Sequence, residues 1–539
     1  MFDKVKSSEI KFSRPPVAFF SMEYGFDDEK NQYAGGLGVL SVDFLLEAGE
    51  QNISFIALGL KYSGAVLSSN FKELEFEDGP ILYLPIADRR VAFRALFKKY
   101  NENTYLILLD IELPENSDVD KDILKTVYDS DAETFLKQQI ILGLGGNMVL
   151  QKLQISPSVY HLNEGHTAFA ALGLLLEEAC TKQISLKEAF ALITGKIVAT
   201  KHTILSAAGM HLPKGLFDFY LGKYCLESGF SVDEVFDFEQ GTKDDDDNFS
   251  TTKFLIKIAG RQNGVSKLHA TYEKKAHPES NLIAITNGVN KNRWQAQEWV
   301  DNEKSLIETK ASLRSNLIDL VKKKTGQELS PDKLTLVWAR RLTKYKRPEI
   351  LFIHPERLLK VLNDEKAAIQ VVISGNAHPS DEFGKRTLKM ILDFIKDNHL
   401  ESKLVYLPDH NPEISHALVA GADVWLNTPI RGMEACGTSG MKAGLNGGLQ
   451  LSVSDGWVDE VDWRGIGWIL PDADAGKTAA AIFDLLESEI IPLFYKKDNE
   501  DRFTDEWEER MRKTQGIVLD NYTTKRMLGD YLKWLYLIN

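Results

Sequence analysis

The sequence has little of several features that mark large classes of protein. Cysteine occurs only three times among 539 residues, as Cys180, Cys225 and Cys436. An odd number with no paired spacing excludes a disulfide framework and a cysteine zinc site. Basic residues are outnumbered, with 64 Lys and Arg against 78 Asp and Glu and a net charge of −14. This acidic total argues against nucleic acid or an anionic membrane as the main partner.

Long hydrophobic runs are also absent. No stretch reaches the roughly 18 apolar residues that a membrane-spanning helix needs. Near the start of the chain, Lys4 and Lys6 precede an apolar run at residues 17–20. This run is too short for the hydrophobic region of a signal peptide. We therefore expect a cytoplasmic protein with reduced thiols, no membrane partner and no bound metal.

What the sequence does contain is the composition of a globular α/β enzyme, with 43% hydrophobic and 26% charged residues. Short β-rich runs alternate with amphipathic stretches such as 348–362 and 385–395, a rhythm typical of right-handed βαβ units around a parallel sheet. The predicted strands lie at 17–20, 53–59, 105–109, 159–162, 197–200 and 283–285, and at 334–338, 369–374, 404–407, 424–426 and 449–453.

This pattern predicts two Rossmann-like lobes facing a cleft. We place the first lobe at residues 1–270 and the second at 271–504. Open parallel sheets bind ligands at the carboxyl ends of their strands, so the functional residues are expected there. The segment 505–539 is charged and helical in pattern and carries Trp507, Trp534 and Tyr536. We expect it to pack back across the lobes.

The most informative segment spans residues 434–447, EACGTSGMKAGLNG, directly after a buried strand. Its glycines allow close approach of the backbone and then begin a helix whose free N–H groups and dipole favour a phosphate. Lys442 lies one turn into that helix and could reach a ligand held at its start. By spacing alone, a strand-to-helix turn with a surface lysine fits equally well.

This segment resembles the pyridoxal-phosphate segment of the glycogen and α-glucan phosphorylase family. In that family the lysine forms a Schiff base with the aldehyde of pyridoxal 5'-phosphate, which requires an amine and a cationic pocket. The resemblance implies that Lys442 carries this cofactor and that Thr438 and Ser439 donate to it. It also implies that Glu434, Cys436 and Gly437 contact the sugar at the point of cleavage, with Cys436 as a contact and not a nucleophile.

A second resemblance is the cationic run at residues 340–347, RRLTKYKR, after the predicted strand 334–338. Such runs are usually solvated surfaces. The place of this one, at the carboxyl end of a parallel strand, favours a binding role instead. The family has a similar run, which implies that Arg340 faces the cofactor phosphate and that Arg341 and Lys346 hold the substrate phosphate.

Further matches occur in the first half of the chain. Gly35, Gly36 and Leu37 belong to a loop, AGGLG, that resembles the family's glycine loop for the substrate phosphate. The segments at 163–166, 200–203 and 263–269 resemble parts of the family's glucan site. They imply that substrate is bound by four further residues: Glu164, His166, His202 and Asn263. Taken singly, each histidine also fits a structural role.

The chain departs from the family at two points. It is shorter than is usual, and the sequence indicates no allosteric site. Where the family has a Tyr-Arg or similar pair that helps bind the cofactor phosphate, this chain has Asp409, His410 and Asn411, without the arginine.

The activity implied by the resemblance is phosphorolysis of an α-1,4-glucan (glycogen, starch or maltodextrin) with orthophosphate, giving glucose 1-phosphate, by a homodimer. The two-lobed GT-B architecture also admits a nucleotide-sugar-dependent glycogen or starch synthase, which would not need Lys442. A glucan-binding homologue without catalysis is a third alternative, which the missing arginine leaves open.

Overall fold

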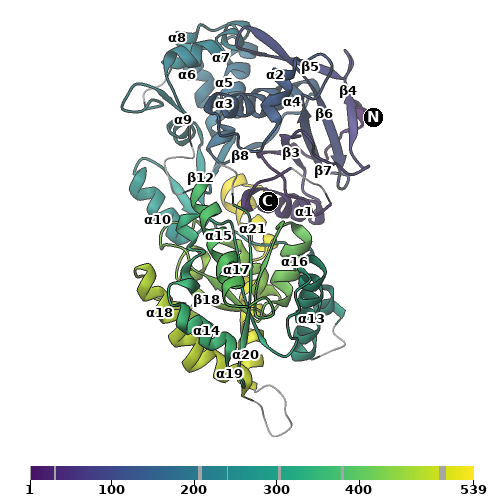
Figure 1. Ribbon diagram of the computed structural model, residues 1–539. Coiled ribbons are helices and arrows are strands. Elements are labelled where there is room, and N and C mark those ends of the chain that lie inside the picture. Colours follow the sequence, from purple (N-terminus) through teal and green to yellow (C-terminus); the bar gives the residue numbers. More distant parts are fainter. Residues whose placement is uncertain are drawn as a thin grey trace. The chain divides into compact units, whose positions relative to one another are not determined.

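The computed structural model describes residues 2–28, 32–203, 209–238, 241–301, 305–377, 381–496 and 505–538, and its elements are labelled in Figure 1. The chain divides into two compact units. Unit 1 comprises Met1–Val265, Ala270–Ile285 and Leu528–Asn539, and unit 2 comprises Ser266–His269 and Thr286–Met527. None of the helices within these described ranges combines the length and the apolar character needed to cross a bilayer.

Unit 1 is built on a large mixed sheet. Seven of its strands run parallel in the spatial order β7-β3-β2-β8-β9-β12-β13, and β4, β5 and β6 add antiparallel pairings beside β7. Counted along the chain, the parallel strands follow the order 3-2-1-4-5-6-7, a doubly wound pattern whose direction reverses between β2 and β8. The strands of this unit are β1 (Asp3–Lys6), β2 (Val17–Phe20), β3 (Phe55–Leu60), β4 (Lys72–Glu75), β5 (Ile81–Ile86), β6 (Arg89–Lys99), β7 (Thr104–Asp110), β8 (Val159–Asn163), β9 (Ile197–Lys201), β10 (His211–Leu212), β11 (Phe249–Ser250), β12 (Arg261–Gly264) and β13 (Leu282–Ala284).

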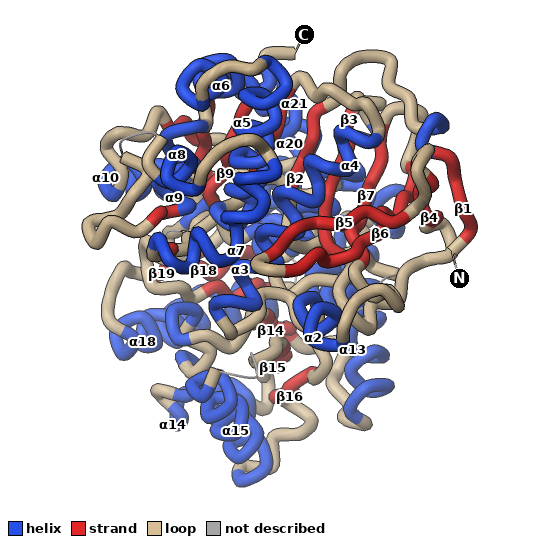
Figure 2. Tube along the Cα trace, turned by 90° about the horizontal axis from the view of Figure 1, so that it is seen from above, coloured by secondary structure: helices blue, strands red, loops and turns tan. Residues whose placement is uncertain are grey.

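Unit 2 contains a parallel sheet in the order β16-β15-β14-β17-β18-β19. Counted along the chain this is 3-2-1-4-5-6, the Rossmann order, so the ligand crevice is expected between β14 and β17. Figure 2 shows β14, β15 and β16 side by side, in agreement with their register. The strands are β14 (Leu334–Ala339), β15 (Ile369–Ser374), β16 (Leu404–Leu407), β17 (Val424–Asn427), β18 (Leu449–Val453) and β19 (Trp468–Leu470).

Helices connect these strands, and local sequence sets where several of them begin and end. Ser305 and Glu308 form a capping box at the start of α13, which ends at Gly326 with a φ of +73°. The helices are α1 (Gly36–Glu50), α2 (Asp118–Lys121), α3 (Ala132–Ile140), α4 (Gly146–Lys152), α5 (Ala168–Lys182), α6 (Leu186–Ile193), α7 (Lys214–Glu227), α8 (Val232–Phe236), α9 (Thr251–Ile258), α10 (Lys267–Ala276), α11 (Lys291–Trp294), α12 (Gln297–Asp301), α13 (Leu306–Thr325), α14 (Pro355–Asn363), α15 (Glu382–Asp397), α16 (Pro412–Gly421), α17 (Thr438–Leu445), α18 (Ala475–Leu485), α19 (Ile491–Tyr495), α20 (Asp505–Asn521) and α21 (Thr524–Asp530).

The α/β class and the two Rossmann-like sheets predicted from the sequence are confirmed. All eleven predicted strands are present, with ends shifted by at most two residues. β13 pairs with β12 in the first sheet, and it carries unit 1 past residue 270 to Ile285, apart from Ser266–His269, which belong to unit 2. β12 has the sequence RQNG, so it lacks the apolar run by which the other strands were found.

The last segment is divided between the two units. Helix α20 belongs to unit 2, where Trp507 is part of the hydrophobic core. Residues Leu528–Asn539 belong to unit 1, where Tyr536 is buried, whereas Trp534 is exposed. In unit 1 the Tyr536 hydroxyl lies 2.6 Å from His161 Nδ1, and Tyr531 accepts a hydrogen bond of 2.8 Å from Asn263 Nδ2. A buried polar network therefore fixes this segment to β8 and β12.

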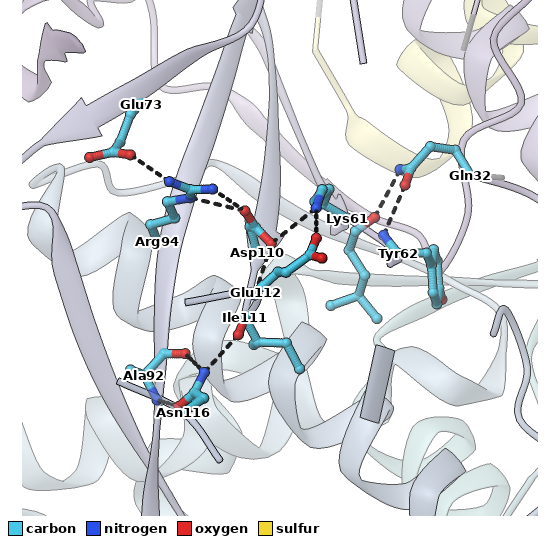
Figure 3. Close-up of polar contacts among 11 residues, drawn as sticks. Gln32, Lys61, Tyr62, Glu73, Ala92, Arg94, Asp110, Ile111, Glu112 and Asn116 are labelled. Carbon is cyan, nitrogen blue, oxygen red and sulfur yellow. Dashed lines mark hydrogen bonds and ion pairs between the residues drawn. The ribbon is translucent and has the colours of Figure 1, made fainter. Parts of the chain in front are cut away.

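A buried carboxylate ties the ends of two strands together in unit 1 (Figure 3). Asp110, the last residue of β7, is fully buried and accepts hydrogen bonds of 2.9 and 2.7 Å from Arg94. Lys61, directly after β3, lies 3.5 Å from the same carboxylate and 2.5 Å from Glu112. Two cations thus compensate the charge of a carboxylate that has no access to water.

We predict that Asp110→Asn lowers the free energy of unfolding of unit 1 by about 3 kcal/mol, because it leaves Arg94 and Lys61 without their shared buried anion. Urea unfolding followed by circular dichroism measures this. The control is Glu227→Gln, which breaks the exposed pair Arg90–Glu227 and should cost no more than about 0.5 kcal/mol. Equal effects of the two substitutions would contradict the prediction.

Candidate functional site

In unit 2 the two segments that flank the reversal of strand order meet through their side chains. The cationic run follows β14, and the segment 434–437 follows β17. Glu434 lies 2.7 Å from Arg340 Nη2 and 2.9 Å from Lys346 Nζ. All three side chains are nearly buried, with 11%, 4% and 10% of their surface exposed. The sheet topology and the ion contacts therefore indicate the same ligand crevice.

When Lys346 is protonated, this ionic cluster has one more positive than negative charge. Burial alone would raise the pKa of Glu434, but Arg340 and Lys346 lower it to about 2, so the carboxylate is ionised. Burial and then the neighbouring Arg340 lower the pKa of Lys346 to about 7, although Glu434 opposes this. Arg340 Nη1 is buried and has no hydrogen-bond partner among the described residues. The cluster can therefore accept a further anion.

The three cations to which the sequence assigns phosphate binding differ in their burial. Arg340 and Lys346 both contact Glu434 in the cluster. Arg341 is exposed, and its charge is one of those that lower the pKa of Lys346. Successive residues at the end of a strand point in opposite directions, and this separates Arg340 from Arg341.

The segment before α17 is held by residues that sequence patterns did not identify. Asp455 accepts hydrogen bonds of 3.0 Å from the backbone N–H groups of Gly432 and Glu434, and burial raises the pKa of Asp455 to about 6. Arg347, the last cation of the run, donates to the carbonyls of Thr428 and Pro429 at 2.8 and 2.9 Å. Arg347 therefore connects the loop after β14 to the loop after β17. Neither role has a local sequence signal.

Helix α17 begins as predicted and places Lys442 inside unit 2. Gly437 has a φ of +80°, which favours glycine, and Thr438 and Ser439 are the first two helical residues. Lys442 is 8% exposed, and its Nζ lies 3.7 Å from the centre of the Trp294 ring. Lys442 is thus a buried amine beside an aromatic face.

The Asn446 side chain links α17 to Trp294. Its Nδ2 donates to the Trp294 carbonyl at 2.8 Å and to the Lys442 carbonyl at 2.9 Å. Its Oδ1 accepts from Ala296 N at 2.8 Å. Trp294 was not predicted as a site residue, because it is more than a hundred positions from Lys442 in the sequence.

The segment that lacks the family's arginine is also ordered in unit 2. His410 Nδ1 lies 3.0 Å from Ser374 Oγ, and its Nε2 lies 2.9 Å from Ser415 Oγ. Burial, together with the charge of Lys442, lowers the pKa of His410 to about 4, so the ring is neutral at pH 7. Asn411 accepts from Ile414 N at 3.0 Å and is the N-cap of α16.

In unit 1 the glycine loop is held by a buried carboxylate. Glu23 Oε2 accepts from the N–H groups of Ala34 and Gly35 at 2.6 and 3.1 Å, and Tyr128 donates to Oε1 at 3.0 Å. Burial raises the pKa of Glu23. Two N–H groups of the loop are therefore engaged within the protein, whereas Gly36 and Leu37 open α1.

Glu164 is the centre of a second cluster in unit 1. Its φ is +85°, unusual for a residue other than glycine, and its Oε1 accepts from Gly165 N at 2.9 Å. Oε2 accepts from His202 N at 2.9 Å and from the Thr203 hydroxyl at 3.0 Å. Burial raises the pKa of Glu164. The structure thus brings Glu164 and His202 together, as the sequence resemblance implied.

His166 and Asn263 are also buried in unit 1. Burial lowers the pKa of His166 to about 3, and its Nε2 has no hydrogen-bond partner within the described ranges. Asn263 is fully buried, accepts from the Thr200 hydroxyl at 2.7 Å and donates to Tyr531. The Asn263 amide is therefore part of the network that holds the C-terminal segment.

A cavity of about 250 Å³ adjoins this cluster in unit 1. Lys201 and Glu273 form an ion pair of 2.7 Å in its wall. The other lining residues are Glu164, Gly165, Ala199, Thr200, Thr203, Thr252, Leu255, Ile256, Gln262, Ala276 and His277. Its wall therefore combines apolar side chains with a few polar and charged groups.

Comparison with known proteins gives consistent matches. A family model described as carbohydrate phosphorylase matches residues 295–464, which include both loops of the ionic cluster and α17. The chain is 31% identical to a maltodextrin phosphorylase of Thermococcus litoralis, over 97% of this chain and 70% of the relative. It is 30% identical to a glycogen phosphorylase of Aquifex aeolicus, over 97% and 86%. An uncharacterized protein of Methanocaldococcus jannaschii is 28% identical over 97% and 99%.

Cys436 allows a simple test of the site's chemistry. The residue is 4% exposed, and burial raises the pKa of its thiol well above the ordinary value, so it carries no thiolate near neutral pH. We predict that iodoacetamide at pH 8 labels the exposed Cys180 of the native protein and leaves Cys436 unmodified. Mass spectrometry of tryptic peptides measures this, with unfolded protein as the control. Rapid labelling of native Cys436 would contradict it.

Proposed function

The chain belongs to the carbohydrate phosphorylase family, and on this premise we propose that it catalyses the reversible phosphorolysis of an α-1,4-glucan. In this reaction orthophosphate accepts the terminal glucosyl unit, giving glucose 1-phosphate and a glucan shortened by one unit. The relatives are named for both maltodextrin and glycogen, so the proposal is made for α-1,4-glucans as a class.

The observation that carries this proposal is the ionic cluster of unit 2. With Lys346 protonated, the side chains of Arg340, Lys346 and Glu434 hold a net charge of +1 in a nearly buried position at the strand-order reversal. Burying an excess cation is costly without an anion to compensate it. Phosphate groups that receive charge-assisted hydrogen bonds, one from Arg340 and another from Lys346, would supply that compensation.

We propose pyridoxal 5'-phosphate as the cofactor, with Lys442 as its attachment residue. The residues present fit this group. Lys442 supplies a buried amine beside the Trp294 ring, and the start of α17 supplies N–H groups after Gly437. The unpartnered Nη1 of Arg340 is a further donor for a phosphate oxygen. Thr438 and Ser439 stand at the helix start, where hydroxyls can add hydrogen bonds.

Cleavage of the glucosidic bond passes through a state with positive charge on the sugar ring. The bound cofactor would supply a phosphate that exchanges a proton with the substrate phosphate. The chain's own residues have the binding tasks. Lys346 and Arg341 would hold the substrate phosphate, Arg340 would hold the cofactor phosphate, and Glu434 would bind sugar hydroxyls with its ionised oxygens.

In unit 1, Glu164 and His202 are proposed to face the glucan. Glu164 has its carboxylate fixed by three donors, so it can hold His202 and Thr203 in one conformation while substrate binds. We further propose that the protein works as a homodimer in the cytoplasm, which family membership supports.

The first test combines activity with the cofactor's colour. The purified protein, supplied with pyridoxal 5'-phosphate, should show a near-ultraviolet band that borohydride removes, and should release glucose 1-phosphate from maltodextrin only when orthophosphate is present. Lys442→Ala should lose the band and the activity together while keeping the native circular dichroism spectrum. The control is Lys477→Ala, at an exposed position, which should keep both. A coloured protein without phosphorolysis, or a coloured and active Lys442→Ala, would refute the proposal.

The second test uses the lowered pKa of Lys346. Sulfate keeps its charge across the range studied, so its inhibition constant against orthophosphate reports the charge of the protein. With a pKa of about 7, Lys346 is cationic below pH 7 and becomes neutral as the pH rises above it. We therefore expect the sulfate inhibition constant to increase between pH 6 and pH 9, by about tenfold to a hundredfold, which is the value of one charge-assisted contact.

Lys346→Arg is the matched variant for this test, because arginine stays charged throughout the range. Its inhibition constant should vary little with pH. A flat profile in the unmodified protein, or the same slope in both proteins, would show that Lys346 does not titrate at the anion site.

A further inference from the structure

Asn163, the last residue of β8, contacts the ring of His202. It is 3% exposed, and its Oδ1 lies 2.7 Å from His202 Nε2. On its other side, the Asn163 Nδ2 lies 3.3 Å from Ser41 Oγ and 3.4 Å from Ser21 Oγ. The amide therefore stands between two serine hydroxyls and one imidazole nitrogen.

The hydroxyl hydrogens of Ser21 and Ser41 form hydrogen bonds with groups other than Asn163. Ser41 Oγ donates to the Leu37 carbonyl at 2.9 Å, and a carbonyl can only accept. Ser21 Oγ lies 2.9 Å from Ser41 Oγ and 3.2 Å from the Glu23 carbonyl, so its single hydrogen has acceptors there. Toward Asn163 both hydroxyls therefore act as acceptors.

This fixes the orientation of the amide. Nδ2 must face the serines, because the opposite orientation would set the amide oxygen against two hydroxyl oxygens with no hydrogen between them. Oδ1 then faces His202, and since it can only accept, the hydrogen of that contact belongs to His202 Nε2. We propose that Asn163 is a positioning residue that holds His202 in its Nε2–H tautomer.

The His202 backbone is fixed from the same place. Glu164, the next residue after Asn163, accepts from His202 N at 2.9 Å. Two consecutive residues at the end of β8 thus act on His202. Glu164 holds the backbone of His202, and Asn163 determines which ring nitrogen of His202 carries the proton. The hydrogen-bond chain also reaches Ser41 in α1, the helix that begins at the glycine loop. In this neutral tautomer Nδ1 carries no hydrogen and can only accept.

The importance of this tautomer for catalysis rests on the proposed function, but the tautomer itself does not. The test is therefore ¹⁵N NMR of protein labelled at histidine, in which the shifts of Nδ1 and Nε2 distinguish the two tautomers. His202→Gln assigns the resonances by their loss. We expect the proton on Nε2 in the unmodified protein. A proton on Nδ1 would overturn the proposal.

Asn163→Leu removes the amide at similar volume, and Ser41→Ala removes one of its acceptors. In Asn163→Leu we expect the Nε2–H preference of His202 to be lost and kcat/KM for the glucan to fall about tenfold, with the sulfate inhibition constant unchanged within about twofold. Ser41→Ala should cause the same two changes, a loss of Nε2–H preference and a fall in kcat/KM, but each to a smaller extent. It replaces Asn163→Leu in the test if Asn163→Leu does not fold.

Asn147→Leu is the matched control, since Asn147 is a buried amide of unit 1 that bonds to the Ala170 carbonyl. It should leave the His202 resonances and kcat/KM unchanged. Retention of the Nε2–H tautomer in Asn163→Leu, or wild-type kcat/KM after its loss, would overturn the positioning role. If the unmodified protein shows no phosphorolysis, the proposed function fails while the NMR result still decides the tautomer.

Discussion

The shared burial of Glu434, Arg340 and Lys346 is the constraint on which the arrangement of unit 2 depends. Glu434 lies in the loop that follows β17, and Arg340 and Lys346 lie in the segment that follows β14. The attraction between the carboxylate and the two cations therefore holds together the two segments at the strand-order reversal. One carboxylate between two cations remains ionised even when buried, and when Lys346 is protonated one positive charge is left for a ligand. The backbone of this loop is in turn fixed by Asp455 and Arg347, which do not belong to the cluster itself.

Unit 1 uses buried carboxylates in a different way at the corresponding edge of its sheet. Glu23 follows β2, Glu164 follows β8, and each binds backbone N–H groups instead of cations. Burial raises the pKa of both, whereas the cations of unit 2 lower that of Glu434. The first kind of site fixes loop geometry, and the second keeps charge available. These are the two requirements of an enzyme that must orient a neutral sugar and bind an anionic phosphate.

Neutral histidines with partners on both ring nitrogens recur in both units. His161 lies between Tyr536 and Thr200, and His410 lies between Ser374 and Ser415. Burial lowers the pKa of each, to about 3 and about 4, so these rings stay uncharged at neutral pH. Through these hydrogen bonds each ring connects segments that are far apart in the sequence. The His202 ring also has an uncharged partner, Asn163, but His202 lies in the candidate glucan cluster.

The sequence by itself determined the sheets and the chemistry of the key segments. Apolar runs identified the parallel strands, because strands covered on both faces are apolar along their whole length. The glycines before Lys442 identified the start of α17, because the residue that precedes this helix, Gly437, has a φ that glycine adopts without strain. Tertiary structure alone decided which cation of the run faces inward, that Arg347 connects the loops after β14 and β17, and that Trp294 borders Lys442. It also decided the strand status of β12 and the division of the C-terminal segment. These features depend on the direction of side chains and on contacts with residues that are often more than eighty positions away in the sequence. The pattern of neighbouring residues in the sequence does not indicate such contacts.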